Sequence, residues 1–537
     1  MRDPTNAEIA DRLALYAALL ELADSTAFAV RAYTRAAELV RATPVAVSEL
    51  VRSGRVRELR GIGPGIEAKL RELVETGEIA ALRELEEELD PALVGYGRLR
   101  GLSGARMLEI SRALGIRTVT AFEEAARSGR LLEVPGIGPV TEAKIRAALD
   151  EEPRARRGLT IDRSRRLSEA IATALDGVVA GEPRRFCELS DRLCVVAPAT
   201  GGPGAVVARF EALPAIVAVL ERSESRAVGL TLEGVPVTLV VTHPEAFGTE
   251  LLRATGSEEF VGALEPLPLA RDEESLFEAL GLAFCPPELR EDPGATAPAG
   301  LVERDDLRGD LHCHTTWSDG RASVREMALA ARALGHQYLA ICDHTPNVSV
   351  VPGLDADALR RQAGEIAAVN EELAPFRVLR GVECDIRADG TLDAPDDVLA
   401  ELEWVQLSLH AGQRRGRDEL TRMVAEAMRH PAVRALSHPK GRILNRRPEN
   451  ALDLEEVFAV ALQTGVALEV NGLPDRLDLS AVHVREALSA GVDLVLSSDA
   501  HSERGLRSIE LALATARKGG ATAERIVNGR RLDQVLR

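Results

Sequence analysis

Seven short apolar runs between residues 307 and 537 each lead into polar residues, in the order DLHCH, YLAICDH, FRVLRGVE, WVQLSLH, VRALSH, VALEVN and VDLVLSSDAH. Helix-like stretches such as SVREMALAARALG and DELTRMVAEAMRH separate most of these runs. Strands that alternate with helices require right-handed crossovers and a mostly parallel sheet. Seven such units are enough to close a barrel, in which the C-terminal ends of the strands meet at one mouth. The sequence therefore predicts a (β/α)7-type barrel.

The polar residues at these strand ends are of the types that bind hydrolytic metals. Six of the ten histidines in the chain belong to this set. Imidazole and carboxylate groups together form the ligands of hydrolytic Zn²⁺ and Mn²⁺ sites. Because side chains alternate along a strand, we expect His312 to share one face with His314, and Asp499 with His501. The nine candidate metal ligands are His312, His314, Asp319, His344, Glu383, His410, His438, Asp499 and His501.

Composition excludes some classes of protein. The net charge of -18 argues against a polycation that coats nucleic acid, and an aromatic content of 3% argues against base stacking on aromatic platforms. The six cysteines include no CxxC pair, which is typical of a reduced, intracellular protein. The polar first residues are unlike a signal peptide, and no apolar run is long enough to span a membrane. We therefore expect a cytoplasmic, nucleoid-associated protein that does not contact membranes.

A glycine-rich repeat occurs in the first 150 residues. The copies are LRGIGPGIEAKLREL, VPGIGPVTEAKIRAA and a weaker one, LRGLSGARMLEISRAL. Glycines permit a tight turn and leave backbone N–H groups at the start of a helix open to a phosphate. The pattern resembles the helix-hairpin-helix motif, which grips DNA backbones without reading sequence, although plain packing of helical hairpins is the alternative. The candidate DNA-binding residues are Gly61, Gly63, Gly65, Lys69, Gly136, Gly138 and Lys144.

The pattern divides the chain into five segments. Residues 1–90 and 91–155 are helical and carry the repeats, and residues 156–290 are mixed α/β, with strands such as RLCVVAP and VPVTLVVT. A stretch rich in Pro, Gly and Ala, residues 291–306, reads as an interdomain linker. The barrel occupies residues 307–537.

This order of segments, followed by GDLHCHTTWSDG, resembles that of bacterial family X DNA polymerases fused to a C-terminal PHP (polymerase and histidinol phosphatase) domain. Further matching stretches are GVECDI, HPKGR and LEVNGLPDRLDLS, and the resemblance covers essentially the whole chain. It implies a multidomain protein with an all-α helix-hairpin-helix region, made of an 8-kDa-like and a fingers-like domain. A nucleotidyltransferase-like α/β palm with a thumb follows, and then the PHP barrel.

The palm departs from the family pattern. Family X palms hold two Mg²⁺ ions on a D-x-D pair and a third carboxylate. The matching positions here are Arg192, Cys194 and Thr238, and the serine that meets the triphosphate in the family is Glu182. Two Mg²⁺ ions need convergent carboxylates, so we expect that DNA polymerase activity is lost. Arg184 and Arg185 in the same motif are candidates for phosphate contacts, with a solvated surface pair as the alternative.

Resemblance to PHP enzymes implies three divalent metals per site, Mn²⁺ and/or Zn²⁺, with Mg²⁺ as the alternative. By that resemblance Glu383, His410 and Asp499 are the catalytic residues, and Glu383 bridges the first two metals. The implied ligand sets are His312, His314, Glu383 and Asp499 for the first metal, Glu383, His410 and His438 for the second, and Asp319, His344 and His501 for the third.

Several further residues are candidates for substrate contacts. Lys440 and Arg442 are placed to clamp a phosphate, and Asn471, with Asp343, is placed to support ligands or contact substrate. Lys69 matches the position of a lyase lysine in the family, although Lys144 occupies the same position in another repeat, where phosphate contact or packing is sufficient.

The sequence thus predicts a DNA-binding, metal-dependent phosphodiesterase, active as a 3′→5′ exonuclease or 3′-end-processing enzyme in DNA repair. Its expected partner is gapped, nicked or 3′-recessed DNA, which it binds as a monomer. Three alternatives remain open: an active gap-filling polymerase with a PHP exonuclease, a PHP phosphatase for a small phosphomonoester, and a non-catalytic DNA scaffold.

Overall fold

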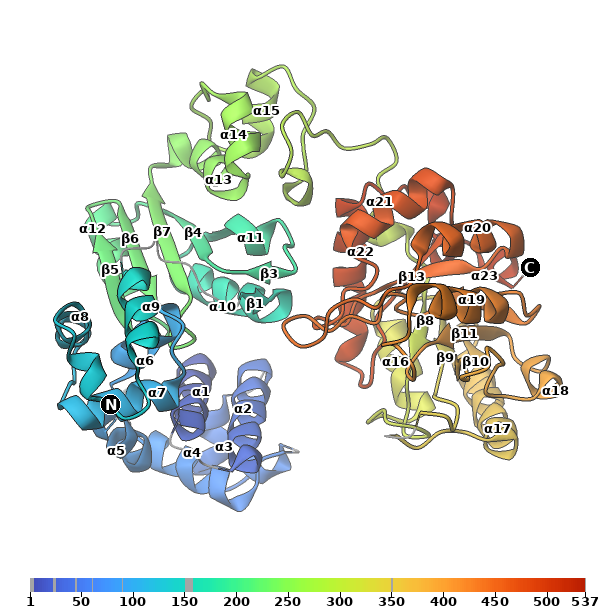
Figure 1. Cartoon of the computed structure of the whole chain (residues 1–537), viewed down its shortest axis with the longest axis horizontal. Coiled ribbons are helices and arrows are strands. Elements are labelled where there is room, and N and C mark those ends of the chain that lie inside the picture. The colour runs from blue at the N-terminus through green and yellow to red at the C-terminus, as the bar shows by residue number, and fades with distance from the viewer. Residues whose placement is uncertain are drawn as a thin grey trace.

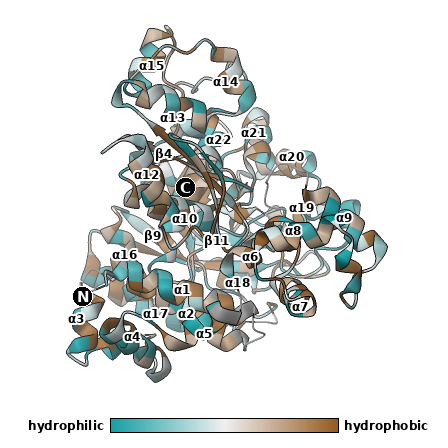
Figure 2. Cartoon of the chain, turned by 90° about the vertical axis from the view of Figure 1, so that its left-hand side faces the viewer, coloured by the Kyte–Doolittle hydropathy of each residue, from teal (hydrophilic) through white to brown (hydrophobic). Residues whose placement is uncertain are grey.

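The computed structural model describes residues 4–22, 26–43, 46–59, 61–88, 90–149, 158–348 and 351–536. Figure 1 shows a helical region (blue to cyan) beside a small sheet, a helical subdomain (light green) beyond that sheet, and a barrel (yellow to red) at the other side of the molecule. Figure 2 shows that the strands around β4 and β11 are coloured largely as hydrophobic. The expected multidomain architecture is confirmed.

The helical region contains two separate apolar cores. The first lies among α1 to α5 and includes Leu13, Leu70 and Leu73; the second lies among α6 to α9 and includes Ile110 and Phe122. The helices of the first core are α1 (Asn6–Leu22), α2 (Ala27–Ala42), α3 (Val47–Arg52), α4 (Pro64–Thr76) and α5 (Ala80–Glu88). Those of the second are α6 (Pro91–Leu99), α7 (Gly104–Leu114), α8 (Val119–Arg127) and α9 (Pro139–Leu149).

The three copies of the glycine repeat share one backbone feature. The first glycine of each copy has a positive φ angle: +112° at Gly61, +81° at Gly101 and +80° at Gly136. L side chains rarely adopt this conformation, so glycine is required for the turn. Helices α4, α7 and α9 begin three residues after these glycines. The weaker copy therefore turns in the same way as the two close copies.

A five-stranded sheet forms the centre of the next domain, in the order β2-β4-β7-β6-β5. Its core includes Val195, Val237 and Leu239, from two neighbouring parallel strands. The strands are β2 (Val178–Ala180), β4 (Leu193–Pro198), β5 (Ala218–Arg222), β6 (Arg226–Leu230) and β7 (Pro236–Thr242), and β1 (Leu159–Thr160) pairs with β3 (Leu189–Ser190). Helices α10 (Ile161–Ala174), α11 (Gly181–Arg184) and α12 (Pro203–Glu211) complete the domain.

The helical subdomain after the sheet is held by a buried charge cluster. Its helices are α13 (Phe247–Thr255), α14 (Glu258–Leu264) and α15 (Glu273–Ala279). The carboxylate of Glu273 at the start of α15 accepts hydrogen bonds from Arg184 of α11 and from the fully buried Arg290. Arg185 donates to the Thr255 carbonyl and pairs with Glu291. Both arginines proposed for phosphate contacts therefore join the sheet to this subdomain instead.

The C-terminal domain is a nearly closed barrel of seven parallel strands in sequential order from β8 to β14. A parallel bridge between Cys313 and Ala500 links its first and last segments. The strands are β8 (Gly309–Cys313), β9 (Tyr338–Ile341), β10 (Arg377–Asp385), β11 (Trp404–Ser408), β12 (Val433–Leu436), β13 (Ala467–Asn471) and β14 (Leu494–Ser497). All seven predicted apolar runs form these strands.

Helices surround the barrel, and several of them begin at residues whose side chains cap the helix. Ser323 and Glu326 form a capping box at the start of α16, and Asp355 caps α17. The helices are α16 (Val324–Ala333), α17 (Ala356–Leu373), α18 (Asp396–Leu399), α19 (Arg417–Met428), α20 (Leu454–Thr464), α21 (Ala481–Ala490), α22 (Ile509–Lys518) and α23 (Leu532–Val535).

One expectation about local structure is wrong. Asp499 and His501 do not share a strand face, because β14 ends at Ser497 and Asp499 has a φ angle of +51°. His438, after β12, also has a positive φ angle, of +28°. Both residues lie in turns that follow their strands. A left-handed conformation is strained for these side chains and is common where function fixes the backbone.

Candidate metal centre

The nine candidate ligands meet at one end of the barrel. His312 lies in β8 and Glu383 in β10, whereas the other seven lie in the segments that follow the strands. The side chains of His312, His314 and Glu383 are essentially inaccessible to solvent, whereas those of His410, Asp319 and His501 are 20%, 24% and 33% exposed. The centre therefore opens to solvent on the side of these three residues.

The Glu383 carboxylate lies in the middle of the cluster. Its Oε1 atom is 2.9 Å from His438 Nε2 and 3.6 Å from His410 Nε2. Its Oε2 atom is 2.9 Å from His344 Nδ1 and 3.5 Å from the Nε2 atoms of both His312 and His314. The two oxygens thus face two different sets of imidazoles, which is the arrangement that a bridging carboxylate requires.

Two aspartates complete the cluster. Asp499 Oδ1 lies 3.1 Å from His314 Nε2 and 3.7 Å from His312 Nε2. Asp319 Oδ2 lies 3.2 Å from His501 Nε2 and 3.7 Å from His344 Nε2. Each carboxylate is therefore shared between two imidazoles, as Glu383 is.

The donor atoms fit divalent metals. In each of three groups, one donor atom per residue lies within 4.8 Å of the others: His314 with Asp319, His344 and His501; His312 with His314 and Asp499; and His344 with Glu383 and His410. The Nε2 atoms of His312 and His314 face each other at 3.2 Å, and the Nδ1 atoms of His314 and His438 are buried without a hydrogen-bond partner. Buried polar atoms normally have partners, so these imidazoles are arranged to receive cations.

The electrostatics of the cluster favour charged carboxylates. Burial opposes ionisation of Glu383, but His344, His410 and His312 outweigh it and hold the pKa of this carboxyl well below its ordinary value. Burial likewise opposes the imidazolium of His312, yet Asp499, Glu469 and Glu383 raise its pKa well above the ordinary value. A concentration of ionised acceptors around imidazoles is an environment that attracts cations.

Glu469 was not singled out from the sequence, although it organises the site. This fully buried residue of β13 lies with Oε1 2.7 Å from His312 Nδ1, and its Oε2 accepts from the backbone N–H of His438 at 2.6 Å. Its sequence signal is the pair of polar residues two apart, Glu469 and Asn471, in the apolar run VALEVN. Residues two apart on a strand share a face, and here that face is the barrel interior.

Other supporting contacts involve predicted and unpredicted residues. Asn471 donates to Asp499 Oδ2 at 2.9 Å, so it supports a ligand directly. Asp385, which the sequence did not single out, accepts from the His410 backbone N–H at 2.9 Å. Asp343 accepts from Thr315 beside His314, and its backbone carbonyl accepts from the Glu383 backbone N–H at 3.2 Å. Such partners fix the orientation of metal-binding side chains.

The two candidate phosphate clamps have other partners. The Lys440 ammonium donates to the Leu452 carbonyl at 3.0 Å, and the Arg442 guanidinium pairs with Glu188 of the sheet domain at 2.9 Å. A different arginine approaches the cluster, with Arg476 Nε 3.9 Å from Asp499 Oδ2. Contact of Lys440 or Arg442 with a substrate stays a prediction.

The altered palm positions lie side by side. Cys194 of β4 is paired in register with Thr238 of β7, and Arg192 immediately precedes β4. Asp191, the acidic residue before Arg192 in the chain, also precedes the strand. Glu182 of α11 accepts from the backbone N–H of Asp191 at 2.9 Å and thereby connects α11 to the segment before β4. Within the described ranges, groups of three or more converging metal-binding side chains occur in the barrel alone.

The helix-hairpin-helix candidates lie at open helix starts. A Cβ atom added to Gly63, Gly65 or Gly138 would meet no atom within 4 Å, so the starts of α4 and α9 are accessible. Lys69 pairs with Glu72 one helical turn away, at 3.3 Å, and Lys144 is exposed on α9. These positions permit close approach of a backbone phosphate.

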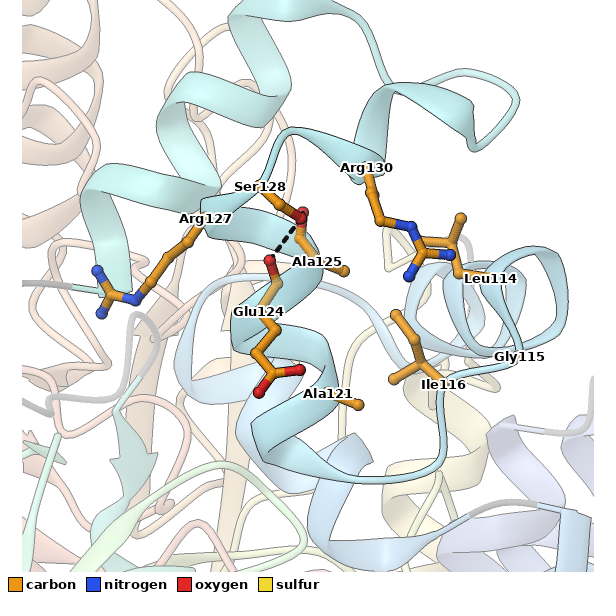
Figure 3. A pocket seen from close by; sticks show the side chains of 9 residues that line it. All are labelled: Leu114, Gly115, Ile116, Ala121, Glu124, Ala125, Arg127, Ser128 and Arg130. Atoms are coloured by element: carbon orange, nitrogen blue, oxygen red, sulfur yellow. Dashed lines mark hydrogen bonds between the residues drawn. The ribbon is translucent and has the colours of Figure 1, made fainter.

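A surface pocket of about 660 Å³ lies in the same helical region, between α7 and α8 (Figure 3). Its lining includes Leu114, Ile116, Glu124, Arg127 and Arg130, and Ser128 donates a hydrogen bond to the Glu124 carbonyl. The pocket brings together no group of metal-binding side chains, and it is separate from the nine-ligand centre.

Together, the fold and the centre define a helix-hairpin-helix protein with a PHP domain. A helix-hairpin-helix domain model matches residues 4–79 and a PHP domain model matches residues 310–472. The DNA polymerase/3′-5′ exonuclease PolX of Bacillus subtilis (strain 168) is 31% identical over 97% of this chain and 96% of its own. The chain belongs to the PolX family.

Other relatives match a smaller part of the chain. A probable phosphatase of Acetivibrio thermocellus is 31% identical over 36% of this chain and 78% of its own. A second, from Syntrophotalea carbinolica, is 30% identical over 41% of this chain and 90% of its own. In the described part of the chain no helix is both long and apolar enough to cross a membrane.

Proposed function

We propose that this protein is a metal-dependent phosphodiesterase that shortens DNA from its 3′ end, and that the barrel is its catalytic centre. The observation that carries the proposal is the convergence of six histidines and three carboxylates, one of which, Glu383, lies among five of the imidazoles. The Bacillus subtilis relative bears both activities in its name, polymerase and 3′-5′ exonuclease. Of the two, the nine-ligand centre supports the second.

The nine ligands are proposed to hold three divalent metals, Mn²⁺ and/or Zn²⁺. Bound metals of this kind supply a nucleophile from water near neutral pH and neutralise charge on the phosphate. The distances leave His314 between two sets, because its nitrogens face both Asp499 and Asp319. We assign His314 to the same metal-binding set as His312 and Asp499. Asp319, His344 and His501 then form a separate set, which is the most exposed.

Neighbouring side chains fix the orientation of these ligands. The contact of Glu469 with His312 Nδ1 directs the Nε2 atom of that ring toward Glu383 and Asp499. Asn471 fixes the other oxygen of Asp499, and Asp385 fixes the backbone at His410. These contacts make the catalytic role of Glu383, His410 and Asp499 depend on neighbouring side chains as well.

Loss of DNA polymerase activity is the second part of the proposal. Nucleotide addition by two Mg²⁺ ions needs carboxylates that converge on both ions. Arg192, Cys194 and Thr238 stand at the three matching positions, and burial raises the pKa of Cys194 to about 12, so this thiol does not become an anionic ligand at neutral pH. The sheet domain is then retained for a purpose other than nucleotide addition.

The helix-hairpin-helix repeats are proposed to hold the DNA backbone at the starts of α4 and α9. The substrate would be gapped, nicked or 3′-recessed DNA. A monomeric state and a cytoplasmic, nucleoid-associated location stay predictions, as does lyase chemistry at Lys69.

A phosphatase acting on a small phosphomonoester is the second candidate. This function is favoured by the two relatives that match a smaller part of the chain, because both are named as probable phosphatases. Turnover of histidinol phosphate without turnover of DNA would support this function over the first.

One gapped DNA substrate, labelled at the 5′ end of the primer, distinguishes these functions. With Mn²⁺ we expect shortening of the primer, with or without dNTPs, and no growth. His344→Ala should abolish the shortening, whereas His430→Ala, a barrel histidine that pairs with Asp396 outside the cluster, should not. Growth of the primer would overturn the loss of polymerase activity, and equal shortening by wild type and His344→Ala would overturn the barrel as the catalytic centre.

A further inference from the structure

Arg476 lies beside the candidate metal centre, in the turn that follows β13. Its Nε atom is 3.9 Å from Asp499 Oδ2, and its side chain is 18% exposed. The Nη1 atom is buried and has no hydrogen-bond partner. A guanidinium presents its donors as a rigid fork, and a buried donor without an acceptor costs free energy. The arrangement is therefore that of a side chain whose acceptor comes from outside the protein.

Other cations near the centre lack this property. The ammonium of Lys440 and the guanidinium of Arg442 already have acceptors in Leu452 and Glu188. Among the described residues, Arg476 alone of the lysines and arginines forms an ion pair within 4 Å of one of the nine ligands. Arg476 is consequently the cation best placed to reach a ligand bound at the metals.

We propose that Arg476 binds a non-bridging oxygen of the substrate's phosphate at the metal centre. This inference rests on the proposed function, because it assigns the phosphate contact of the same site. The surroundings of Arg476 include His438 and Arg447 as well as Asp478 and Asp499. The guanidinium would therefore lie beside Asp499, which is also a candidate metal ligand. Its Nη1 atom would donate a hydrogen bond to the phosphate.

The turn that carries Arg476 is held by the sheet domain. Arg442 donates from Nε to the Arg476 carbonyl at 2.9 Å, and from Nη2 to the Leu477 carbonyl. Leu477 has a φ angle of +45°, which is strained for a branched side chain and needs support from its surroundings. The same guanidinium pairs with both oxygens of Glu188, between β3 and the palm helix α11. Glu188 is thus a positioning residue for Arg476.

This connection gives the altered palm a role. Asn445, three residues beyond Arg442, also reaches the palm and donates to the Gly158 carbonyl at 3.0 Å. The loop that makes both contacts begins at His438, one of the nine ligands, and it extends toward β1 and β3 in Figure 1. A palm without metal-binding carboxylates would in this way still shape the substrate site of the barrel.

The first test measures phosphate binding and catalysis separately. Arg476→Gln, Arg476→Lys and wild type are loaded with Mn²⁺, their metal content is measured, and binding of inorganic phosphate is followed by calorimetry. Loss of a charge-assisted contact should weaken phosphate binding and raise the KM for 3′-recessed DNA about 10- to 100-fold. Metal content should stay unchanged, and Arg476→Lys should recover part of the loss because it keeps the charge.

Arg360→Lys is the matched control, since Arg360 pairs with Asp397 and Glu401 on the outer surface of the barrel. Unchanged phosphate affinity and KM in Arg476→Gln, or no phosphate binding by wild type, would overturn the assignment. Wild type that binds phosphate through Arg476 but leaves DNA intact would overturn the proposed function and keep Arg476 as an anion site.

The second test concerns the positioning contact. Glu188→Gln should weaken phosphate binding several-fold in the full chain, with the metal content and circular dichroism of wild type. Glu291→Gln is the matched control. It breaks the ion pair with Lys518 of α22, which is another contact with the barrel domain but does not involve the turn of Arg476. Equal phosphate affinity in Glu188→Gln and wild type would reject the positioning role. A loss in Glu291→Gln as large as in Glu188→Gln would also reject it.

Discussion

The Glu469 carboxylate is fully buried and holds two candidate ligands, through His312 Nδ1 and the His438 backbone N–H. It also accepts from Gln406, at 2.7 Å, and from Ser437, at 3.1 Å. A buried carboxylate with this many donors is stabilised in its charged form. Its removal should therefore disturb the metal centre although it is not one of the nine ligands.

We expect Glu469→Gln to lower metal affinity and 3′-end shortening by about 10- to 100-fold, as is typical when the partner of a metal-binding histidine is lost. Metal titration of the metal-free protein measures the first quantity, and a labelled-primer assay the second. Glu455→Gln, at the exposed start of α20, is a suitable control. Wild-type metal affinity in Glu469→Gln would contradict this role.

A second prediction at this scale concerns Glu273 in α15. Burial opposes its ionisation, but Arg184 and Arg290 outweigh this and lower its pKa from the ordinary 4.5. The contribution to stability is therefore present above pH 4.5 and is lost as pH falls through the lower pKa of the folded state. Because removal of one partner leaves Arg290 buried and uncompensated, Glu273→Gln should cost about 3–5 kcal/mol near neutral pH.

Hydrogen exchange of the backbone amides in α13 to α15 measures this loss of stability. It reports on the helical subdomain separately from the barrel. Exchange in α13 to α15 should be faster in Glu273→Gln than in wild type at pH 7. The difference should disappear as pH falls through the pKa of Glu273, because wild type then loses the same ionised carboxylate. Equal protection in the two proteins at pH 7 would refute the prediction. Glu274→Gln is the neighbouring control, because Glu274 is exposed.

At the scale of the element, a glycine with positive φ fixes each hairpin. Gly61→Ala should destabilise the turn before α4 by about 1–2 kcal/mol, because φ is +112° there. Gly65→Ala should be neutral or stabilising, since Gly65 lies inside α4 with open space around it. Weaker binding of gapped DNA by Gly61→Ala than by Gly65→Ala, measured by fluorescence anisotropy, is the expected result. Equal weakening by both variants would point to phosphate contact at Gly65 instead of the shape of the turn.

The strands show what sequence patterns predict well. Each apolar run between residues 307 and 537 became a strand, because burial on both faces demands continuous apolar residues. The same patterns brought nine ligands to one end of the barrel, since parallel strands end on the same side. Backbone geometry after the strands was less predictable: Asp499 and His438 reach the centre from turns with positive φ, which alternation does not describe.

Contacts between distant residues left no sequence signal. Glu188 and Arg442 are 254 residues apart, and only the arrangement of two domains brings them together. A loop cation such as Arg442 is equally suited to a phosphate and to a carboxylate. The sequence alone therefore does not identify its partner. The partners of Arg184 and Arg185, Glu273 and Glu291, likewise belong to a later segment of the chain. Glu469 does leave a signal, because it lies two residues before Asn471 and so shares its strand face, but the sequence does not show that its carboxylate contacts His312 and His438.

At the scale of the whole molecule, the chain belongs to the PolX family and combines helix-hairpin-helix repeats, a sheet domain and a barrel. The palm has no carboxylate at Arg192, Cys194 or Thr238, whereas the barrel brings all nine candidate ligands together. The two domains touch through Glu188 and Arg442 and through Glu291 and Lys518. Of these two contacts, the pair of Glu188 with Arg442 supports the turn that carries Arg476, beside the candidate metal centre.

The most direct measurement is the rate of 3′-end shortening with Mn²⁺ for wild type, Glu383→Gln and Glu403→Gln. Glu383 lies between five imidazoles, whereas Glu403 pairs with Arg377 and Arg380 away from the cluster. The account predicts a loss of at least about 100-fold in Glu383→Gln and near wild-type rates in Glu403→Gln. A Glu383→Gln variant that shortens DNA as fast as wild type would contradict the barrel as the catalytic centre.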